Sequence, residues 1–249
     1  MLRCMAGLTV DVRTEDGVAD AYLARPDAGV TRGGVLLLMD TFGLRDQIRA
    51  MADCICAGGY AVLAPNLFYR AGRAPVLTLP DLTDPQGRAK FFEQVKPLMG
   101  ALTPERICAD ARAYVDYLAE EAPGPLAITG YCMGVRVGWR VATAYPDRVD
   151  ALAGFHGGRL VTDDPDSPHR TADRLRAEVY LGHADNDATN TAEQIRALDQ
   201  ALEAAGVRYR SEVYAGAAHG FTMADTPAYN QQAAERHFRE LFELLERLA

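Results

Sequence analysis

The stretch that decides the fold is Pro-Leu-Ala-Ile-Thr-Gly-Tyr-Cys-Met-Gly, residues 125–134, which runs directly into the helical spacing of Val135–Ala144. Pro125–Thr129 is a short apolar run, as a strand buried on both faces requires. The next five residues have the form Gly-x-nucleophile-x-Gly, with cysteine in the nucleophile position, between a strand and a helix. Small flanking residues let strand and helix approach closely, and the helix N-terminus favours a thiolate. We therefore predict that Cys132 is a nucleophile above the sheet; the alternative is a buried cysteine in a glycine-rich turn.

The same alternation extends outward in both directions along the chain. Short apolar runs predict further parallel strands at Gly34–Met39, Tyr60–Ala64, Ala151–Phe155 and Ala177–Leu181, with a last strand at Arg210–Tyr214. Helical spacing predicts helices at Asp46–Ala57, Pro104–Ala119, Val135–Ala144, Thr191–Ala205 and Tyr229–Leu248. The alternating segments Leu8–Val12 and Ala19–Ala24 predict a hairpin at a sheet edge. The result is an α/β fold, a mostly parallel central sheet with helices on both faces and its site beyond the carboxyl ends of the strands.

Composition narrows the class of protein and of partner. The chain has 249 residues, 49% of them apolar and 24% charged, as expected for one globular domain over residues 1–249. The net charge of −8 and the lack of long basic runs predict neither nucleic acid nor anionic membranes as partners. The irregular stretch Asn66–Gln86 contains three prolines and follows a strand, so we expect a loop or small cap over the site; the alternative is a flexible linker.

The cellular compartment is predicted from what the chain lacks. No apolar stretch reaches the roughly 18–20 residues that span a bilayer, and the first residues do not resemble a signal peptide. The five cysteines, at positions 4, 54, 56, 108 and 132, are scattered and odd in number, which favours free thiols in a reducing compartment. Cys54 and Cys56 point to different faces of a helix, so a shared metal is not expected. We predict a cytoplasmic protein without a metal.

A cysteine nucleophile needs a base and an orienting acid, which in this architecture follow it in that chain order: nucleophile, acid, histidine. His219 lies directly after the last predicted strand and is the predicted base, with His156 as the reserve candidate or a wall residue of the same pocket. The loop after Ala177–Leu181 offers two acids, Asp185 and Asp187. We prefer Asp187, which would hold the imidazole tautomer and stabilise its charged form.

Together these motifs resemble the dienelactone hydrolases, a cysteine-nucleophile branch of the α/β-hydrolase fold, along almost the whole chain. The similar segments are Met39-Asp40-Thr41-Phe42-Gly43, the run from Gly59 to Tyr69, Gly-Tyr-Cys-Met-Gly at 130–134 and Ala-His-Gly-Phe around His219. The resemblance implies that a lactone or small ester is hydrolysed through a thioester on Cys132, without a cofactor. It also implies that the backbone N–H groups of Thr41 and Met133 hold the oxyanion.

The chain departs from this family at two positions. A glutamate that acts on the resting thiol in the family is replaced by Asp40, which would modulate the thiol or merely cap the following helix. A substrate-binding arginine is replaced by Met223, which cannot bind an anion and suggests a less charged substrate. A second family arginine could match Arg88, whose other interpretation is a solvated residue at a helix start. Tyr69 and Tyr131 are weaker candidates for lining the pocket.

The sequence therefore predicts a monomeric hydrolase that acts on a small lactone or ester through Cys132, Asp187 and His219. The nearest alternative is a thioesterase or acyltransferase on the same fold. A third hypothesis is a redox sensor or binding module without turnover, which uses the thiol of Cys132. The complete set of predicted partners favours the hydrolase, because a sensor needs neither the histidine nor the acid.

Overall fold

Eight strands form one sheet in the computed structural model, which describes residues 7–27 and 31–248. The strands are β1 (Leu8–Thr14), β2 (Gly17–Ala24), β3 (Gly34–Leu38), β4 (Ala61–Pro65), β5 (Leu126–Tyr131), β6 (Ala151–Phe155), β7 (Glu178–Ala184) and β8 (Tyr209–Tyr214). Their order across the sheet is β1-β2-β4-β3-β5-β6-β7-β8. The hairpin β1–β2 joins β4 in antiparallel pairing, and the other neighbours are parallel.

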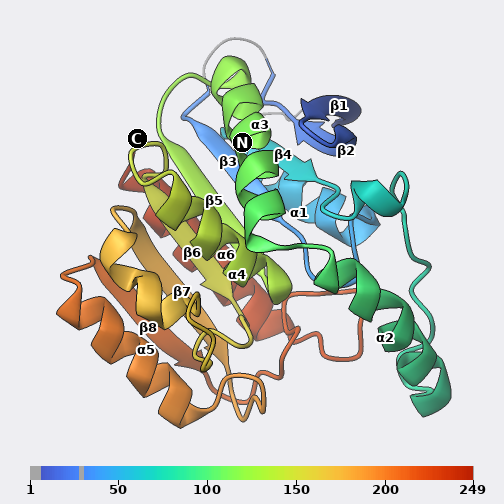
Figure 1. The fold of residues 1–249 in the computed structure, drawn as a ribbon, viewed down its shortest axis with the longest axis vertical. Helices are drawn as coiled ribbons and strands as arrows, with labels where there is room; N and C mark the ends of the chain where they lie inside the picture. The colour runs from blue at the N-terminus through green and yellow to red at the C-terminus, as the bar shows by residue number, and fades with distance from the viewer. Residues whose placement is uncertain (1–6, 28–30, 249) are drawn as a thin grey trace.

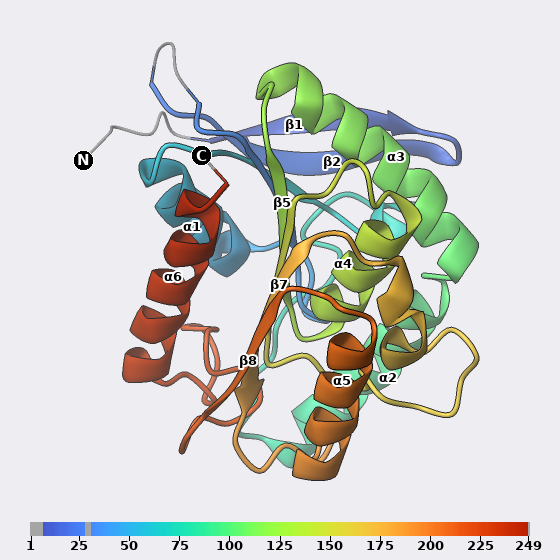
Figure 2. The same ribbon diagram turned by 90° about the vertical axis from the view of Figure 1, so that its left-hand side faces the viewer.

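Helices cover both faces of the sheet (Figures 1 and 2). They are α1 (Asp46–Ala57), α2 (Pro85–Gly100), α3 (Pro104–Glu121), α4 (Met133–Ala144), α5 (Ala192–Ala204) and α6 (Gln231–Glu246), with short 3-10 helices at η1 (Tyr69–Ala71) and η2 (Pro168–Arg174). In Figure 2, α1 and α6 lie on one side of the sheet, and α3, α4 and α5 lie on the other. Every residue of β3, β4, β5 and β6 is therefore buried, which explains why these strands are almost entirely apolar.

The prediction of a mostly parallel α/β sheet with an edge hairpin is confirmed. Each predicted strand is present within a few residues of its expected ends, and α1 has the predicted bounds. One helix was not predicted. It is α2, which begins at Pro85, where the irregular stretch was expected to end. Asp84 caps this helix by accepting hydrogen bonds from the backbone N–H groups of Gln86 and Gly87, and Pro85 occupies its first turn.

The stretch that precedes α2 is tied to the hairpin side of the sheet. The Asn66 amide donates to the Asp20 carboxylate on β2 at 2.9 Å, and the Ala74 backbone N–H donates to the same carboxylate at 2.9 Å. Further along, Phe91 and Phe92 of α2 contact Phe42, with ring centroids 5.5 and 6.3 Å apart. The element that packs beside the loop after β3 is thus α2.

The prediction that the cysteines are free thiols holds for some of them only. Cys56 is disulfide-bonded, so the expectation of a free thiol is wrong for this residue. Cys54, Cys108 and Cys132 are free, and Cys54 is exposed on α1. In the part of the chain that the structure describes, none of the helices combines the length and the apolar character needed to cross a bilayer.

Candidate active site

The predicted nucleophile Cys132 lies between the end of β5 and the start of α4, in the turn that the sequence predicts. Its backbone has φ of 53° and ψ of −113°. Residues other than glycine rarely adopt a positive φ of this kind. Two hydrogen bonds hold this conformation. The Cys132 N–H donates to the Phe155 carbonyl at 3.1 Å, and its carbonyl accepts from the Val135 N–H at 3.2 Å. The turn is therefore fixed by neighbouring backbone rather than by the cysteine.

The flanking glycines are required by close backbone approach. A Cβ on Gly130 would lie 2.4 Å from the Gly134 carbonyl oxygen, and a Cβ on Gly134 would lie 2.2 Å from the Leu38 carbonyl oxygen. Both distances are far inside van der Waals contact. Glycine at position 134 thus brings the N-terminus of α4 against the carboxyl end of β3, from which the loop with Thr41 leaves.

The acid and the base come from the loops after β7 and β8. The His219 Nδ1–H donates to Asp187 Oδ2 at 2.6 Å, and the Asp187 side chain is 4% exposed. The other Asp187 oxygen accepts from the Thr189 backbone N–H at 2.8 Å and from its hydroxyl at 2.7 Å. Asp185 instead accepts from the Gly216 N–H at 2.9 Å. Of the two acids, the structure therefore brings Asp187 to the imidazole.

The charges of His219 and Asp187 are coupled. Burial acts to lower the pKa of His219, but hydrogen bonds to Asp187 and Cys132 and the attraction of both groups raise it to about 10. Burial acts to raise the pKa of Asp187, but the bonds from His219 and Thr189 outweigh it, so its pKa is lowered. The arrangement favours an imidazolium next to the Asp187 carboxylate, and Cys132 acts on the ring in the same direction.

His156, the reserve candidate for the base, is a wall residue beside His219. The two ring centroids are 5.4 Å apart, and His156 is 1% exposed. Its Nε2 is hydrogen-bonded to the Thr222 hydroxyl at 2.7 Å, while its Nδ1 has no partner among the described residues. Burial, with the nearby charges of His219 and His237, lowers its pKa well below the usual value. His156 is thus a neutral ring in contact with the proposed base.

Asp40 is buried directly before Thr41 and forms an ion pair with Arg45. The Arg45 guanidinium donates to the two Asp40 oxygens at 2.7 and 3.1 Å, and the Phe42 N–H donates to the same carboxylate at 3.0 Å. Burial raises the pKa of Asp40, and Arg45 partly offsets that effect. Asp40 does not cap α1, whose N-cap is Arg45. The carboxylate therefore shapes the turn that carries the Thr41 N–H.

Arg45 also joins this turn to the loop that follows His219. It donates to Asp225 at 2.6 and 3.1 Å, and its Nη2 lies 3.5 Å from the Met223 sulfur. Met223 is 1% exposed. The position that departs from the family pattern is thus buried against an arginine whose charge two carboxylates already neutralise.

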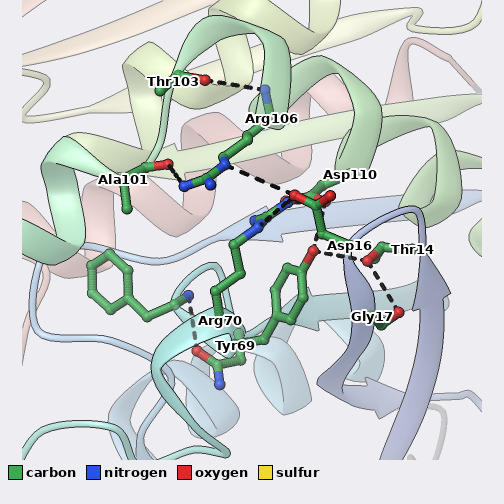
Figure 3. Close-up of polar contacts among 11 residues, drawn as sticks. Thr14, Asp16, Gly17, Tyr69, Arg70, Ala101, Thr103, Arg106 and Asp110 are labelled. Carbon is green, nitrogen blue, oxygen red and sulfur yellow. Dashed lines mark hydrogen bonds and ion pairs between the residues drawn. The ribbon is translucent and has the colours of Figure 1, made fainter.

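Tyr69 lies in a different cluster, near the hairpin (Figure 3). Its hydroxyl donates to Asp110 on α3 at 2.9 Å and is hydrogen-bonded to the Thr14 hydroxyl at 2.8 Å. Arg70 forms an ion pair with the same Asp110 at 2.7 Å and with Asp16 at 2.7 Å. The structure therefore engages Tyr69 in joining the hairpin, η1 and α3.

The other weak candidates form no hydrogen bond with His219 or Asp187. Tyr131 is fully buried, and its hydroxyl is 3.3 Å from His237 Nε2 on α6. Arg88 is an exposed residue in the first turns of α2, as its alternative interpretation expects.

Sequence reasoning did not single out Thr189 and Arg45. Thr189 follows Asp187 by two residues, a spacing at which aspartate often accepts from the local backbone, so this signal was present. Arg45 joins segments about 180 residues apart in the chain, for which no local signal exists. Within residues 7–27 and 31–248, no three or more histidine, cysteine or acidic side chains are arranged to hold a metal ion.

Comparison with known proteins places this chain in a family. The family model described as "Dienelactone hydrolase family" matches residues 19–249. A Salmonella typhi protein named "Putative carboxymethylenebutenolidase" is 27% identical over 247 residues, which cover 96% of this chain and 86% of the relative. A Mus musculus "Carboxymethylenebutenolidase homolog" is 29% identical over 206 residues, covering 81% of this chain and 75% of the relative.

Solved structures agree at the level of the fold. The crystal structure of a "Putative Dienelactone Hydrolase" from Klebsiella pneumoniae superimposes with a TM-score of 0.82 and 22% identity, covering 98% of this chain and 99% of the other. The family match extends over most of the described chain, from β2 to α6. The chain belongs to the dienelactone hydrolase family, and its activity is that of a carboxylic ester or lactone hydrolase.

Proposed function

We propose that the protein hydrolyses a lactone or small carboxylic ester through a thioester on Cys132, with His219 as base and Asp187 as its orienting acid. The observation that carries the proposal is the 2.6 Å hydrogen bond between His219 Nδ1 and Asp187, and it is supported by the effect of Cys132, which helps to raise the pKa of the same ring. Nucleophile, base and orienter in contact are the requirement of covalent catalysis. The names of the relatives, carboxymethylenebutenolidases, support a lactone as substrate.

In the first half of the reaction, the Cys132 sulfur attacks the carbonyl carbon and the proton of the thiol resides on His219. The backbone N–H groups of Thr41 and Met133 stabilise the oxyanion that forms. The tetrahedral intermediate collapses, the carbon–oxygen bond of the ester breaks, and the leaving oxygen takes the proton from His219. The product of this half is a thioester on Cys132.

In the second half, His219 removes a proton from water, and the resulting hydroxide attacks the thioester carbonyl. The carbon–sulfur bond breaks, the acid product leaves, and the sulfur regains the proton shared with His219. Asp187 remains ionised and keeps Nδ1 protonated, so Nε2 is the nitrogen that exchanges protons. The cytoplasmic location, the monomeric state, the absence of a cofactor and the single domain with a loop at residues 66–86 stay predictions.

The decisive experiment compares Cys132→Ala with Cys54→Ala on dienelactone and on simple aryl esters. Cys54 is a free, exposed cysteine on α1, so its replacement controls for the loss of a thiol. We expect Cys132→Ala to abolish turnover and Cys54→Ala to retain it. Mass spectrometry after rapid mixing should find the acyl group on the peptide that contains Cys132. Full turnover by Cys132→Ala would overturn the proposal.

The same assay separates hydrolysis from acyl transfer. With an added alcohol competing against water, a hydrolase yields mainly the acid, whereas an acyltransferase yields mainly the new ester. Reversible oxidation of Cys132 without turnover of any ester would instead support the sensor hypothesis.

A further inference from the structure

Arg45 contacts two segments of the proposed active site, the second of which lies 180 residues further along the chain. On one side, its guanidinium donates to the two oxygens of Asp40 at 2.7 and 3.1 Å, and to the Gly43 carbonyl at 3.2 Å. On the other side, it donates to the two oxygens of Asp225 at 2.6 and 3.1 Å. The five N–H groups of the arginine thus match five oxygen acceptors.

The clamp formed by Arg45, Asp40 and Asp225 is largely withdrawn from solvent. The side chains of Arg45 and Asp40 are 10% and 3% exposed, and that of Asp225 is 31% exposed. The guanidinium also lies over the Phe42 ring, 5.3 Å from its centroid. Paired bonds between a planar guanidinium and a planar carboxylate fix orientation as well as distance. The clamp therefore holds its two segments in one relative arrangement.

The first segment carries Thr41, whose backbone N–H is one of the two proposed oxyanion donors. Thr41 directly follows Asp40, so the clamp determines the path of the chain at this donor. The same end of β3 packs against the start of α4, where a Cβ on Gly134 would lie 2.8 Å from the Met39 carbonyl oxygen. Because Cys132 lies two residues before Gly134, the clamp and the nucleophile turn meet at this end of the strand.

The second segment follows His219, the proposed base. The Met223 N–H donates to the Gly220 carbonyl at 2.9 Å, so the chain turns tightly directly after the histidine. The Met223 sulfur lies 3.5 Å from Nη2 of Arg45, and Asp225 follows two residues later. The clamp therefore also limits how far the loop of the base can move relative to the oxyanion donor.

We propose that Arg45 is a positioning residue, which holds the Thr41 N–H and His219 at the separation that the tetrahedral intermediates require. This inference rests on the proposed function, because it assigns a role within the same site. Arg45 itself makes or breaks no covalent bond. Both halves of the reaction pass through an oxyanion, so a looser clamp slows formation and hydrolysis of the thioester alike. KM depends on the ratio of these two rates and therefore changes little.

The first test is Asp225→Asn, which frees the second segment and leaves Asp40 paired with Arg45. Because Asp225 is partly exposed, the change leaves no deeply buried charge unpaired. We expect kcat for phenyl butyrate to fall about tenfold, since a displacement of about 1 Å costs up to about 10²-fold. KM should stay within about twofold of the wild type. Rates are expressed per folded molecule, from urea unfolding of each variant; an unchanged kcat would overturn the inference.

The second test is Arg45→Lys, which keeps a positive charge beside Asp40. An ammonium group has three donors on one nitrogen and cannot bind two carboxylates through paired bonds. We expect kcat to fall at least as far as in Asp225→Asn. The double variant should lose no more than about twofold beyond Arg45→Lys, because both changes break the same connection. Losses that multiply would show that the two residues act independently and would refute the clamp.

Arg49→Gln is the matched control. Arg49 lies on the same helix and carries the same charge, but it pairs at 3.4 Å with Asp46, whose side chain is fully exposed. Exposed pairs of this kind contribute little, so kcat should stay within about twofold of the wild type. A loss in Arg49→Gln as large as in Arg45→Lys would mean that any charge removed from α1 has the same effect, and would contradict the inference.

The pH profile separates positioning from an effect on the charge of the base. Hydrogen bonds to Asp187 and Cys132 raise the pKa of His219, and Asp225→Asn leaves both partners in place. The dependence of kcat/KM on pH should therefore keep its midpoint while its height falls. A shifted midpoint at unchanged height would assign the role of the clamp to electrostatics and overturn the inference.

An aldehyde inhibitor measures the arrangement without turnover. When butanal reacts with Cys132, the sulfur–carbon bond forms, the second bond of the carbonyl opens and the thiol proton passes through His219 to the oxygen. We expect the inhibition constant of butanal to rise about tenfold in Asp225→Asn, in parallel with the loss of kcat. An unchanged constant would contradict the inference alone. A wild type that neither hydrolyses esters nor forms the adduct would contradict the proposed function instead.

Discussion

Cys132 has a backbone conformation that its surroundings impose. A positive φ at a residue other than glycine costs free energy of order 1–3 kcal/mol and persists only where neighbouring structure determines it. Here, the N–H and the carbonyl of Cys132 are both held by backbone groups, and the flanking glycines admit the close approach of β3 and α4. The site thus stores strain at the residue that the proposed reaction requires.

The role of Asp187 is tested by Asp187→Asn, which keeps the shape of the side chain and removes its charge. The amide no longer stabilises a protonated His219, so the pKa of His219 should fall from about 10. We expect kcat to decrease by about 10³-fold or more at neutral pH. Steady-state assays across pH measure both effects.

Asp185→Asn is the control for this prediction. Asp185 accepts from the Gly216 N–H and does not contact His219, so its replacement should alter kcat only a few-fold, on the order of a lost surface contact. A larger effect of Asp185→Asn than of Asp187→Asn would contradict the assignment of the acid.

At the residue scale, the sequence predicted side chains whose roles follow from local motifs. Cys132 and His219 lie in short motifs next to predicted strands, and the structure places them where those motifs imply. The choice between Asp185 and Asp187 needed the path of the loop after β7, since both acids follow the same strand. Arg45 and Asp225 could not be paired from sequence, because only the packing of the loop after β8 against the loop after β3 brings them together.

At the element scale, α2 is the helix that the sequence interpretation missed. Its start signals, Asp84 followed by Pro85, were present, but they lie at the end of a proline-rich stretch. Only Phe91 and Val95 of this helix are buried, so its apolar stripe is weak. The remaining helices bury a continuous stripe against the sheet, and their spacing predicted them because tertiary packing and local pattern agree.

The contact between α4 and β3 is tested by Gly134→Ala. The added Cβ would lie 2.2 Å from the Leu38 carbonyl, so helix and strand must separate. Overpacking of this kind costs about 1–3 kcal/mol of the free energy of unfolding, and kcat should fall because the Thr41 and Met133 N–H groups move apart. Urea unfolding and ester hydrolysis measure the two effects.

Gly100→Ala provides the comparison for Gly134→Ala. Gly100 ends α2, and a Cβ there meets no atom within 4 Å. The substitution should raise helix stability by up to about 1 kcal/mol, the ordinary gain from glycine to alanine in a helix. If both variants changed stability equally, the close approach at Gly134 would not be the cause.

At the scale of the whole molecule, one sheet brings together residues from the loops after β3, β5, β7 and β8. Such a core buries several histidines in neutral form. Burial lowers the pKa of His183 to about 4 and that of His237 to about 3. In the unfolded chain these rings take up a proton near pH 6.5, so protonation favours unfolding.

The folded state should therefore lose stability as the pH falls from about 6.5 toward 3–4. At pH 5, each buried histidine contributes a loss of about 2 kcal/mol, from roughly 1.4 kcal/mol per pH unit. We expect His237→Gln to reduce the difference in unfolding free energy between pH 7 and pH 5 by about this amount. The measurement is urea unfolding of both proteins at each pH. An unchanged difference would show that His237 is not the group responsible.

The contribution of His219 has the opposite sign. Its pKa is raised to about 10, so the stabilisation from its imidazolium is complete below about pH 6.5 and is lost as the pH rises toward 10. Between these limits, the buried neutral rings and the paired imidazolium together define a window of greatest stability around neutral pH.

The residues of the proposed catalytic group lie far apart in the chain, so the ribosome synthesises them at different times. Cys132 leaves the ribosome roughly 90 residues before His219, a delay of about 5–20 s at ordinary elongation rates. Arg45 waits still longer for Asp225, its partner from the far end of the chain. A nascent or prematurely terminated polypeptide therefore carries the thiol without its proposed base. On the proposed function, hydrolysis can begin only after the last strand has docked on the sheet and brought the loop with His219 to Cys132.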